Sequence, residues 1–393
     1  MKKILALLLA VTMVACLFAG CQNGTTEPTD PATEPTTDVT TEPTTEPATE
    51  PASEDATVPS TDGAKKVAFV TDVGNIDDHS FNQYSYEGVT KFCSNAGLEC
   101  SYYKPAGDTD QDRIDAINQA VKDGYGVVVM AGYLFGPACY TVATEHPEVL
   151  FLALDVTEGD LKAESVPSNI ALICYQEEQA GYLAGYAAVY DGYKELGFLG
   201  GMAVPAVIRY GYGFVQGADA AAKELGVNDV NIKYWYSGGF AATDEVKNKM
   251  DGWYSEGTEV VFACGGPVCQ SCDAAAQANG GKMIGVDVDQ SGQFDTVITS
   301  ATKGLAESVN EALTDSLNNG WKFTEAYSGK ETKLGAAENC VGLPMETSKF
   351  NKFTQEQYDA MYASIVDGTL TIDDSFDTTV TPSVTNVTVD YQG

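Results

Sequence analysis

The chain has few histidines and few positive charges. It holds two histidines, His79 and His146, and 22 Lys plus Arg against 56 Asp plus Glu, for a net charge of −34. Zinc sites and hydrolytic triads draw on histidine, and we find no metal or hydrolase motif around either one. Nucleic acids and other polyanions are bound through dense Lys and Arg, so the acidic balance argues against them. Neutral and cationic solutes remain open.

Phosphate-binding loops and catalytic pairs are also absent. Neither the segment after Asp72 nor the one at Gly265 reads as G-x-G-x-x-G or as a P-loop, so a dinucleotide or triphosphate site is unsupported. Asp77 and Asp78 could imitate a catalytic carboxylate pair, but the side chains of adjacent residues seldom point at one site. Followed by Ser80, the two acids instead predict a helix N-terminus with capping side chains. We therefore predict no catalytic site, no metal and no cofactor.

The start of the chain lacks a hydrophobic run long enough to be a secure membrane span. Two lysines precede an uncharged stretch, residues 4–20, which predicts a signal peptide over residues 1–20. An uncleaved membrane anchor is the alternative, but the stretch is short and Thr12 interrupts it. The Ala19-Gly20 pair before Cys21 is similar to a bacterial lipobox, which implies that Cys21 carries a lipid anchor.

The segment after Cys21 lacks the hydrophobic residues that a core requires. Residues 22–62 are almost wholly Thr, Glu, Pro, Ala, Ser and Asp, with ten acids and no base. Such a composition cannot offset the entropy of ordering, so residues 21–62 are predicted to be a lipidated cysteine followed by a disordered tether. We interpret the tether as a spacer without a binding role.

Cysteine is comparatively plentiful, at ten residues. Cys16 would leave with the signal peptide and Cys21 would be acylated, so eight remain. Cys269 and Cys272 form a single C-x-x-C, and zinc or redox work would need a second ligand pair or a thioredoxin-like context. A disulfide or buried thiols is the better interpretation, and spacing alone assigns no pairing.

Residues 63–393 alternate between β-branched hydrophobic runs and amphipathic stretches, which predicts an α/β fold with parallel sheets covered on both faces. Their length favours two lobes. The expected strands are 67–71, 127–130, 149–154, 170–174, 196–199, 260–263, 283–286 and 297–299. The expected helices are 84–95, 111–123, 177–190, 211–225 and 306–318.

Carboxylates and glycines follow several of these strands, where open parallel sheets bind ligands. Asp72 follows the first strand and Asp287 follows residues 283–286. An ionised carboxylate can accept hydrogen bonds from a sugar diol, and aromatic faces such as Phe81 and Phe240 suit a flat base. Together these residues would suit a nucleoside, although core packing is the alternative for each phenylalanine.

These motifs resemble those of one family. Thr71 to Gln83, followed by Glu87-Gly88, is similar to the opening signature of the basic membrane protein family, the PnrA-like lipoproteins. Further similar stretches follow in the family's order at 178–185, 197–201, 265–266, 285–290 and 299–303. One long motif with five ordered followers is far more specific than any single motif.

The resemblance implies a type I periplasmic-binding-protein-like fold, in which two Rossmann-like lobes joined by three crossovers close on a purine nucleoside. The first lobe would begin with 63–174 and the second with 175–284, while 285–393 would be shared across the hinge. An ABC permease and ATPase would take up the solute. The protein would therefore be a lipid-anchored nucleoside-transport lipoprotein on the extracytoplasmic face of the membrane.

The resemblance also implies roles for single residues. Asp72 would meet the base edge, and Asn82 belongs to the same ligand-binding motif. Phe81 and Phe240 would sandwich the base, with Tyr236 as the alternative to Phe240. The ribose would lie near four residues, with the Asp287 carboxylate accepting from its diol: Gly265, Gly266, Asp287 and Lys303.

Competing interpretations stay open. A receptor for a sugar or a signalling molecule could have the same fold, and importer and sensor differ only in their partners. A nucleoside hydrolase is a rival of another class, disfavoured because no clustered-Asp calcium motif opens the folded part. Asp72 could accept from several purine edges, so adenosine, guanosine and inosine are equally compatible.

Overall fold

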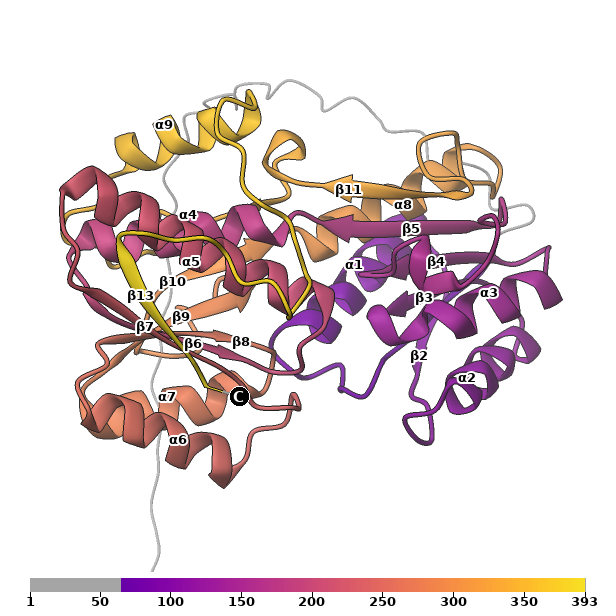
Figure 1. The fold of residues 1–393 in the computed structure, drawn as a ribbon. Coiled ribbons are helices and arrows are strands. Elements are labelled where there is room, and N and C mark those ends of the chain that lie inside the picture. Colours follow the sequence, from indigo (N-terminus) through magenta and orange to yellow (C-terminus); the bar gives the residue numbers. More distant parts are fainter. Residues whose placement is uncertain (1–64, 393) are drawn as a thin grey trace, which may run out of the picture. The chain divides into compact units, whose positions relative to one another are not determined.

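A computed structural model of the protein describes residues 65–392. The signal peptide, Cys21 and the tether predicted at the N-terminus lie outside the described residues. Within these residues the strands form two sheets, each covered by helices on both faces (Figure 1). The α/β class predicted from the alternating pattern is confirmed.

The first sheet has the strand order β11-β5-β4-β3-β1-β2, and the described pairings within it are parallel. Helices α1 and α8 pack on one face, and α2 and α3 pack on the other. The elements of this lobe are β1 (Lys66–Val70), α1 (Phe81–Ala96), β2 (Cys100–Tyr103), α2 (Asp110–Lys122), β3 (Tyr125–Ala131), α3 (Gly136–Glu145), β4 (Leu150–Leu154), β5 (Ile170–Tyr175), α8 (Leu305–Asn318) and β11 (Lys330–Leu334).

The second sheet has the order β12-β10-β9-β8-β6-β7-β13, parallel except for the antiparallel pair of β10 with β12. Helices α4 and α5 lie on one face, and α6 and α7 lie on the other (Figure 1). The elements of this lobe are α4 (Glu177–Asp191), β6 (Glu195–Gly200), α5 (Pro205–Leu225), β7 (Val230–Tyr236), α6 (Asp244–Ser255), β8 (Val260–Cys264), α7 (Val268–Asn279), β9 (Lys282–Asp287), β10 (Val297–Lys303), β12 (Val341–Gly342), α9 (Gln355–Val366) and β13 (Val387–Gln392).

Within the described range the chain passes between the two sheets three times, after β5, after β10 and after β11. Strands β9 and β10 belong to the second sheet, so the boundary predicted at 284 falls inside β9. The C-terminal part is divided between the lobes, because α8 and β11 return to the first lobe.

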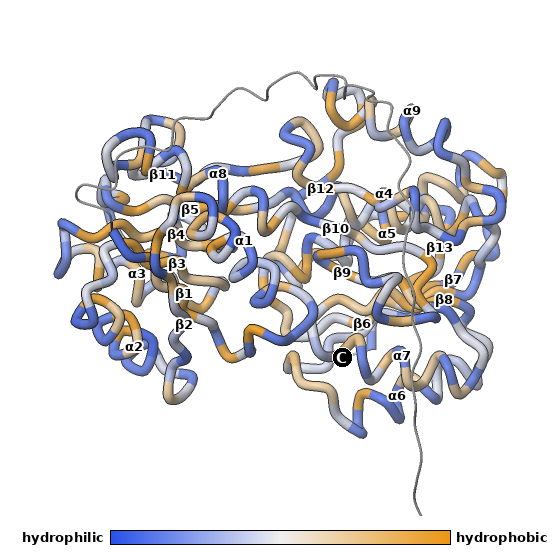
Figure 2. Tube along the Cα trace, turned by 180° about the vertical axis from the view of Figure 1, so that it is seen from behind, coloured by the Kyte–Doolittle hydropathy of each residue, from blue (hydrophilic) through white to orange (hydrophobic). Residues whose placement is uncertain are grey.

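Hydrophobic residues run along the central strands, while α2 and α6 are more hydrophilic on their outer sides (Figure 2). All five residues of β4 and of β8 are buried. A strand that is hydrophobic on both faces is stable only where helices cover both faces. The continuous hydrophobic runs of the sequence are thus the centres of the two sheets.

Helices α4 and α5 approach so closely that only glycine fits at their crossing. A Cβ on Gly181 or Gly185 would lie 2.1 or 2.0 Å from a backbone oxygen of α5. The same holds in reverse for Gly213 and Gly217 against α4. This close contact fixes the two helix starts, which carry the charged residues Glu177 and Arg209 of the site described next.

Candidate functional site

The register of the strands brings the predicted site residues to neighbouring strand ends. In the first sheet Val70 pairs with Met130 and Ala131 with Leu154, so the residues that follow β1, β3 and β4 lie side by side. In the second sheet Gly200 pairs with Cys264, and Asp287 with Thr302. Parallel sheets bind ligands at this carboxyl edge.

Residues from both edges line one cavity of about 670 Å³ between the lobes. That volume lies within the range of small-molecule sites. All the ligand-binding residues predicted from the sequence contribute to its wall: Asp72, Phe81, Asn82, Phe240, Gly265, Gly266, Asp287 and Lys303. The structure therefore brings the predicted set together, which makes this cavity the candidate binding site.

Asp72 is held as a hydrogen-bond acceptor in the first lobe. Its Oδ1 accepts from the Gly74 backbone N–H at 2.8 Å and from Asn82 Nδ2 at 3.1 Å. Burial raises the pKa of Asp72 to about 6, against the lowering effect of these two donors. Its second oxygen lies near Gly132, where a Cβ would come within 2.9 Å of it.

The loop after β1 ends in the capped helix start that the sequence predicts. Both carboxylate oxygens of Asp78 accept backbone N–H groups of the first turn of α1, from Asn82 and Gln83, at 3.0 Å each. Asp78 also accepts from Asn82 Nδ2 at 3.0 Å, so the Asn82 amide is fixed by two carboxylates. Capping and binding residues are thereby joined in one rigid loop.

A buried charge cluster borders the cavity, and three of its residues, Asp155, Asp287 and Lys303, line the cavity wall. Lys303 Nζ lies 2.8 Å from Asp155 Oδ2, 3.3 Å from Glu177 Oε1 and 3.9 Å from Asp287 Oδ1. Arg209 Nε lies 2.7 Å from the other oxygen of Glu177. Buried charges are tolerated when they are paired in this way.

The pairing shows in the acid–base properties of the cluster. Burial opposes the charge of Lys303, yet the three carboxylates raise its pKa overall. Burial raises the pKa of Asp155 to about 6, although Lys303 lowers it. For Glu177, Arg209 and Lys303 outweigh burial and lower the pKa. Burial also raises the pKa of Asp287, with Lys303 and Ser80 acting against it.

Aromatic rings from both lobes face the cavity. Phe81 opens α1, and its ring centroid lies 4.7 Å from Lys303 Nζ. Phe240 packs over Gly201, where a Cβ would lie 2.4 Å from the ring. Tyr236 is turned away: its hydroxyl bonds that of Tyr234 at 2.7 Å, and it is absent from the cavity wall. Of the two candidates for the second stacking ring, only Phe240 is in position.

Some wall residues were not predicted from the sequence. Asp155 Oδ1 and Tyr210 Oη are buried without a hydrogen-bond partner, and both residues line the cavity. Unpaired buried polar groups are costly, so these atoms mark places for polar atoms of a ligand. Asp155 directly follows the predicted strand 149–154. The rule that ligand-binding residues follow the strands of a parallel sheet, which pointed to Asp287, therefore also points to Asp155. Tyr210 lies inside a helix and gave no such signal.

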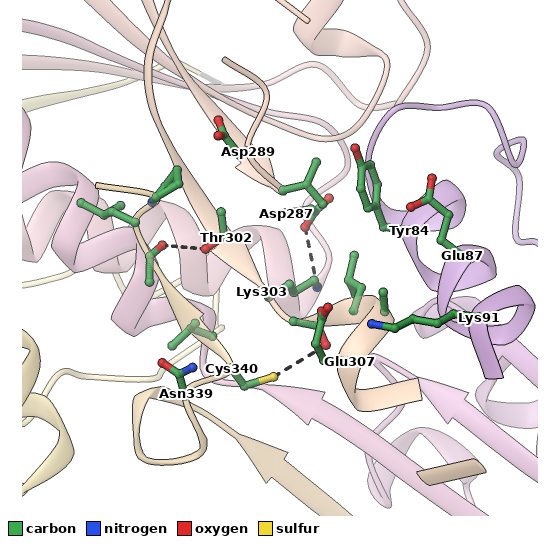
Figure 3. Close-up of a pocket in the computed structure, with 18 of the residues that line it drawn as sticks. Tyr84, Glu87, Lys91, Asp287, Asp289, Thr302, Lys303, Glu307, Asn339 and Cys340 are labelled. Carbon is green, nitrogen blue, oxygen red and sulfur yellow. Dashed lines mark hydrogen bonds and ion pairs between the residues drawn. The ribbon is translucent and has the colours of Figure 1, made fainter. Parts of the chain in front are cut away.

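A second, larger cavity of about 880 Å³ shares Asp287 and Lys303 with the first (Figure 3). Lys91 from α1 and Glu307 from α8 point toward one another across it (Figure 3). Its polar groups are largely used within the protein, as when Thr302 Oγ1 donates to the Gly342 carbonyl at 3.0 Å. It is also the more open cavity, so the smaller one is the better binding site.

The remaining sequence expectations concern metals, thiols and membranes. In the described range no group of three or more His, Cys, Asp or Glu side chains has an arrangement that could hold a metal ion. The eight cysteines of that range are free thiols, and Cys269 and Cys272 are both buried. None of the described helices has the length and hydrophobicity to cross a bilayer.

The fold and the cavity define a two-lobed solute-binding protein of the type I periplasmic class. The family model of the PnrA-like ABC transporter substrate-binding proteins matches residues 65–375, and the chain belongs to this family. It is a family of extracytoplasmic binding proteins that serve ABC transporters, not of enzymes.

Curated relatives are similar over most of their length. Basic membrane protein A1 of Borrelia garinii is 27% identical over 292 residues, covering 72% of this chain and 83% of the relative. The CD4+ T-cell-stimulating antigen of Listeria innocua is 26% identical over 329 residues, covering 78% and 87%. The family resemblance read from the motifs is thereby confirmed.

Solved structures agree on the fold. An ABC transporter solute-binding protein of Aeropyrum pernix has a TM-score of 0.67 at 20% identity, covering 80% of this chain and 95% of its own. The corresponding protein of Conexibacter woesei has a TM-score of 0.63 at 22% identity, covering 79% and 99%. The type I fold is thus confirmed.

Proposed function

We propose that the protein captures a purine nucleoside between its lobes and delivers it to an ABC permease and ATPase. The observation that carries the proposal is the set of side chains that line the cavity. Two aromatic rings, Phe81 and Phe240, and two carboxylates, Asp72 and Asp287, line the same space of about 670 Å³. A nucleoside offers what these groups bind, namely a flat base and a diol.

The charges of the cavity favour a nucleoside over a nucleotide. The buried cluster contains three carboxylates, Asp155, Glu177 and Asp287, against two cations, Lys303 and Arg209. Both cations are already paired with carboxylates. A phosphate would therefore meet excess negative charge without a free cation to neutralise it.

The experiment that tests the proposal identifies the solute directly. The purified protein is denatured, and the small molecules released are identified by mass spectrometry and compared with those from a Phe240→Ala variant. We expect an intact purine nucleoside from the wild type, and less of it from the variant. Recovery of a sugar or another solute in stoichiometric amount would replace the nucleoside, and recovery of free base would indicate hydrolysis.

We further propose that the lobes, whose first parts are 63–174 and 175–284, close over the solute. Closure excludes water and strengthens the hydrogen bonds of the buried carboxylates. Small-angle scattering should show a smaller radius of gyration with saturating nucleoside. An unchanged radius with bound nucleoside would contradict closure.

A further inference from the structure

Besides the ion pair of Lys303 with Asp155, which lies at the crossover after β10, two side-chain hydrogen bonds join the lobes directly. Ser80 Oγ in the first lobe donates to Asp287 Oδ2 in the second at 2.5 Å. Gln290 Nε2 in the second lobe donates to the His79 carbonyl in the first at 3.3 Å. Ser80 is fully buried, and Asp287 and Gln290 are 6% and 1% exposed. We call these two hydrogen bonds the latch.

The Ser80 hydroxyl can bond to Asp287 because Asp78, and not Ser80, caps the start of α1. It occupies the N-cap position of α1, where a serine hydroxyl ordinarily accepts an N–H of the first turn. Here Ser80 makes no side-chain cap bond, because Asp78 accepts those N–H groups instead. Asp78 also accepts the Ser80 N–H at 3.0 Å, which fixes the Ser80 backbone, while the Ser80 hydroxyl is directed at Asp287 in the other lobe.

Both sides of the latch are held in backbone conformations that are uncommon outside glycine. His79 has φ 56° and Asp287 has φ 67°, and the two residues belong to opposite sides of the contact. Such conformations persist where the surroundings determine them, and they gather at functional sites. Gln290 is fixed as well, because its Oε1 accepts the Val286 N–H at 3.0 Å.

We propose that the latch holds a fraction of the solute-free molecules closed, and that Ser80 is a positioning residue that orients Asp287 for the solute. The inference rests on the proposed closure of the lobes. A ligand that binds only the closed form has an apparent Kd equal to its intrinsic Kd divided by the closed fraction. The latch therefore raises affinity for any solute that the closed cavity accepts.

Ser80→Ala tests the proposal against a matched control. Ser85 lies in the same helix, is equally buried, and has an Oγ without a hydrogen-bond partner. Ser80→Ala should increase the radius of gyration of the solute-free protein and weaken inosine binding about tenfold, the loss typical of one charge-assisted hydrogen bond. Ser85→Ala should change neither, and with saturating inosine all three proteins should reach the same radius.

Further variants separate the latch from a loss of structure. Ser80→Gly also lacks the hydroxyl, and glycine is well suited to an N-cap position. It should show the same larger radius and weaker binding that are expected of Ser80→Ala, and it replaces that variant if Ser80→Ala folds poorly. Because Ser80 acts through Asp287, Ser80→Ala should cost much less in an Asp287→Asn background than in the wild type.

The outcomes are distinct. A solute-free radius and an inosine affinity equal to wild type in Ser80→Ala and Ser80→Gly would overturn the latch, and so would additive effects with Asp287→Asn. If the wild type binds none of adenosine, guanosine and inosine, the proposed function fails. The solute-free radii of the serine variants still decide whether the latch holds the lobes closed.

Discussion

Lys303 Nζ, at the end of β10, lies 2.8 Å from the carboxylate of Asp155, which follows β4 in the other sheet. This ion pair joins the carboxyl edges of the two sheets across the cavity. Lys303 also contacts Glu177 and Asp287, so one ammonium group serves three carboxylates.

The first prediction is that phosphate on the solute prevents binding. The 5′-monophosphate of the preferred nucleoside should bind at least about a hundredfold more weakly, because its charge would be buried unpaired beside the cluster. Titration calorimetry of both compounds with the same protein measures the ratio. Equal affinity for nucleoside and nucleotide would show that the cluster does not face the 5′ end.

The second prediction concerns Asp287. Its carboxylate should accept from both ribose hydroxyls, so Asp287→Ala should lose on the order of 2 to 4 kcal/mol of binding free energy. Asp287→Asn should lose less, since the amide keeps one acceptor and asparagine tolerates the φ of 67°. Calorimetry with inosine measures both losses.

Asp287→Gly controls for backbone strain at the same position, because glycine adopts a positive φ freely. It should lose affinity as Asp287→Ala does, while its melting temperature should stay nearer to wild type. If Asp287 only stabilises its turn, the alanine variant would melt lower and still bind inosine with full affinity.

The third prediction is a pH dependence of binding that comes from Asp72. Its pKa of about 6 lies above the usual range, so lowering the pH through 6 protonates the acceptor and should weaken nucleoside binding. Asp155, which also has a pKa of about 6, should contribute to the same decline. Affinities measured from pH 5 to 8 in wild type and Asp72→Asn test this, and the variant should show a smaller step.

Stability should move in the opposite direction over the same window. A carboxyl group whose pKa is raised in the folded state binds its proton more readily there than in the unfolded chain. Its contribution to the free energy of unfolding is therefore present at low pH and lost as the pH rises from about 4 to about 6. Denaturant titrations should show this difference between wild type and Asp72→Asn. An equal pH slope in both proteins would assign the effect elsewhere.

The fourth prediction separates Phe240 from Tyr236. Phe240→Ala should lose about 1 to 3 kcal/mol of nucleoside binding with little change in stability, because the ring faces the cavity. Tyr236→Phe should leave binding unchanged and lower stability by about 1 kcal/mol, since it removes the hydrogen bond to Tyr234. Calorimetry and thermal melts of the two variants suffice, and the reverse pattern would restore Tyr236 as the stacking residue.

The fifth prediction concerns the membrane anchor. Cys21→Ala should release the protein from membranes into the soluble fraction, because the cysteine after Ala19-Gly20 would carry the lipid. Cys16→Ala is the matched control within the signal peptide and should leave the protein on membranes. Retention of the Cys21→Ala protein after fractionation would refute the lipid anchor.

The continuous hydrophobic runs made the centres of both sheets predictable, and the positions after them located most of the cavity. Strand β2 was not predicted, because it is the partly exposed edge strand of the first sheet. Strand β7 was also not predicted, because Val230 to Tyr236 is only partly buried. The short helix α3 was missed for a similar reason, since it has little amphipathic pattern.

The contacts between lobes could not be predicted from the sequence. The pairing of Lys303 with Asp155 joins residues 148 positions apart, and no local pattern encodes it. Ser80 was expected near a helix start, and its burial against Asp287 depends on how the two sheets meet. Local patterns thus predicted which residues lie at the strand ends, and the tertiary arrangement determined their partners.

Strand β13 lies beyond residue 375, where the family match ends, and pairs in parallel with β7 from Val387 to Gln392. Strand β13 covers the edge of the aromatic segment Tyr234 to Tyr236 of β7. Strand β13 is itself the outermost strand of the sheet, and it carries the exposed, charged residue Asp390. Uncovered edges of this kind recruit other chains, whereas charged edges resist them. A protein shortened to residue 375 would expose the edge of β7 and should therefore aggregate more readily through that edge.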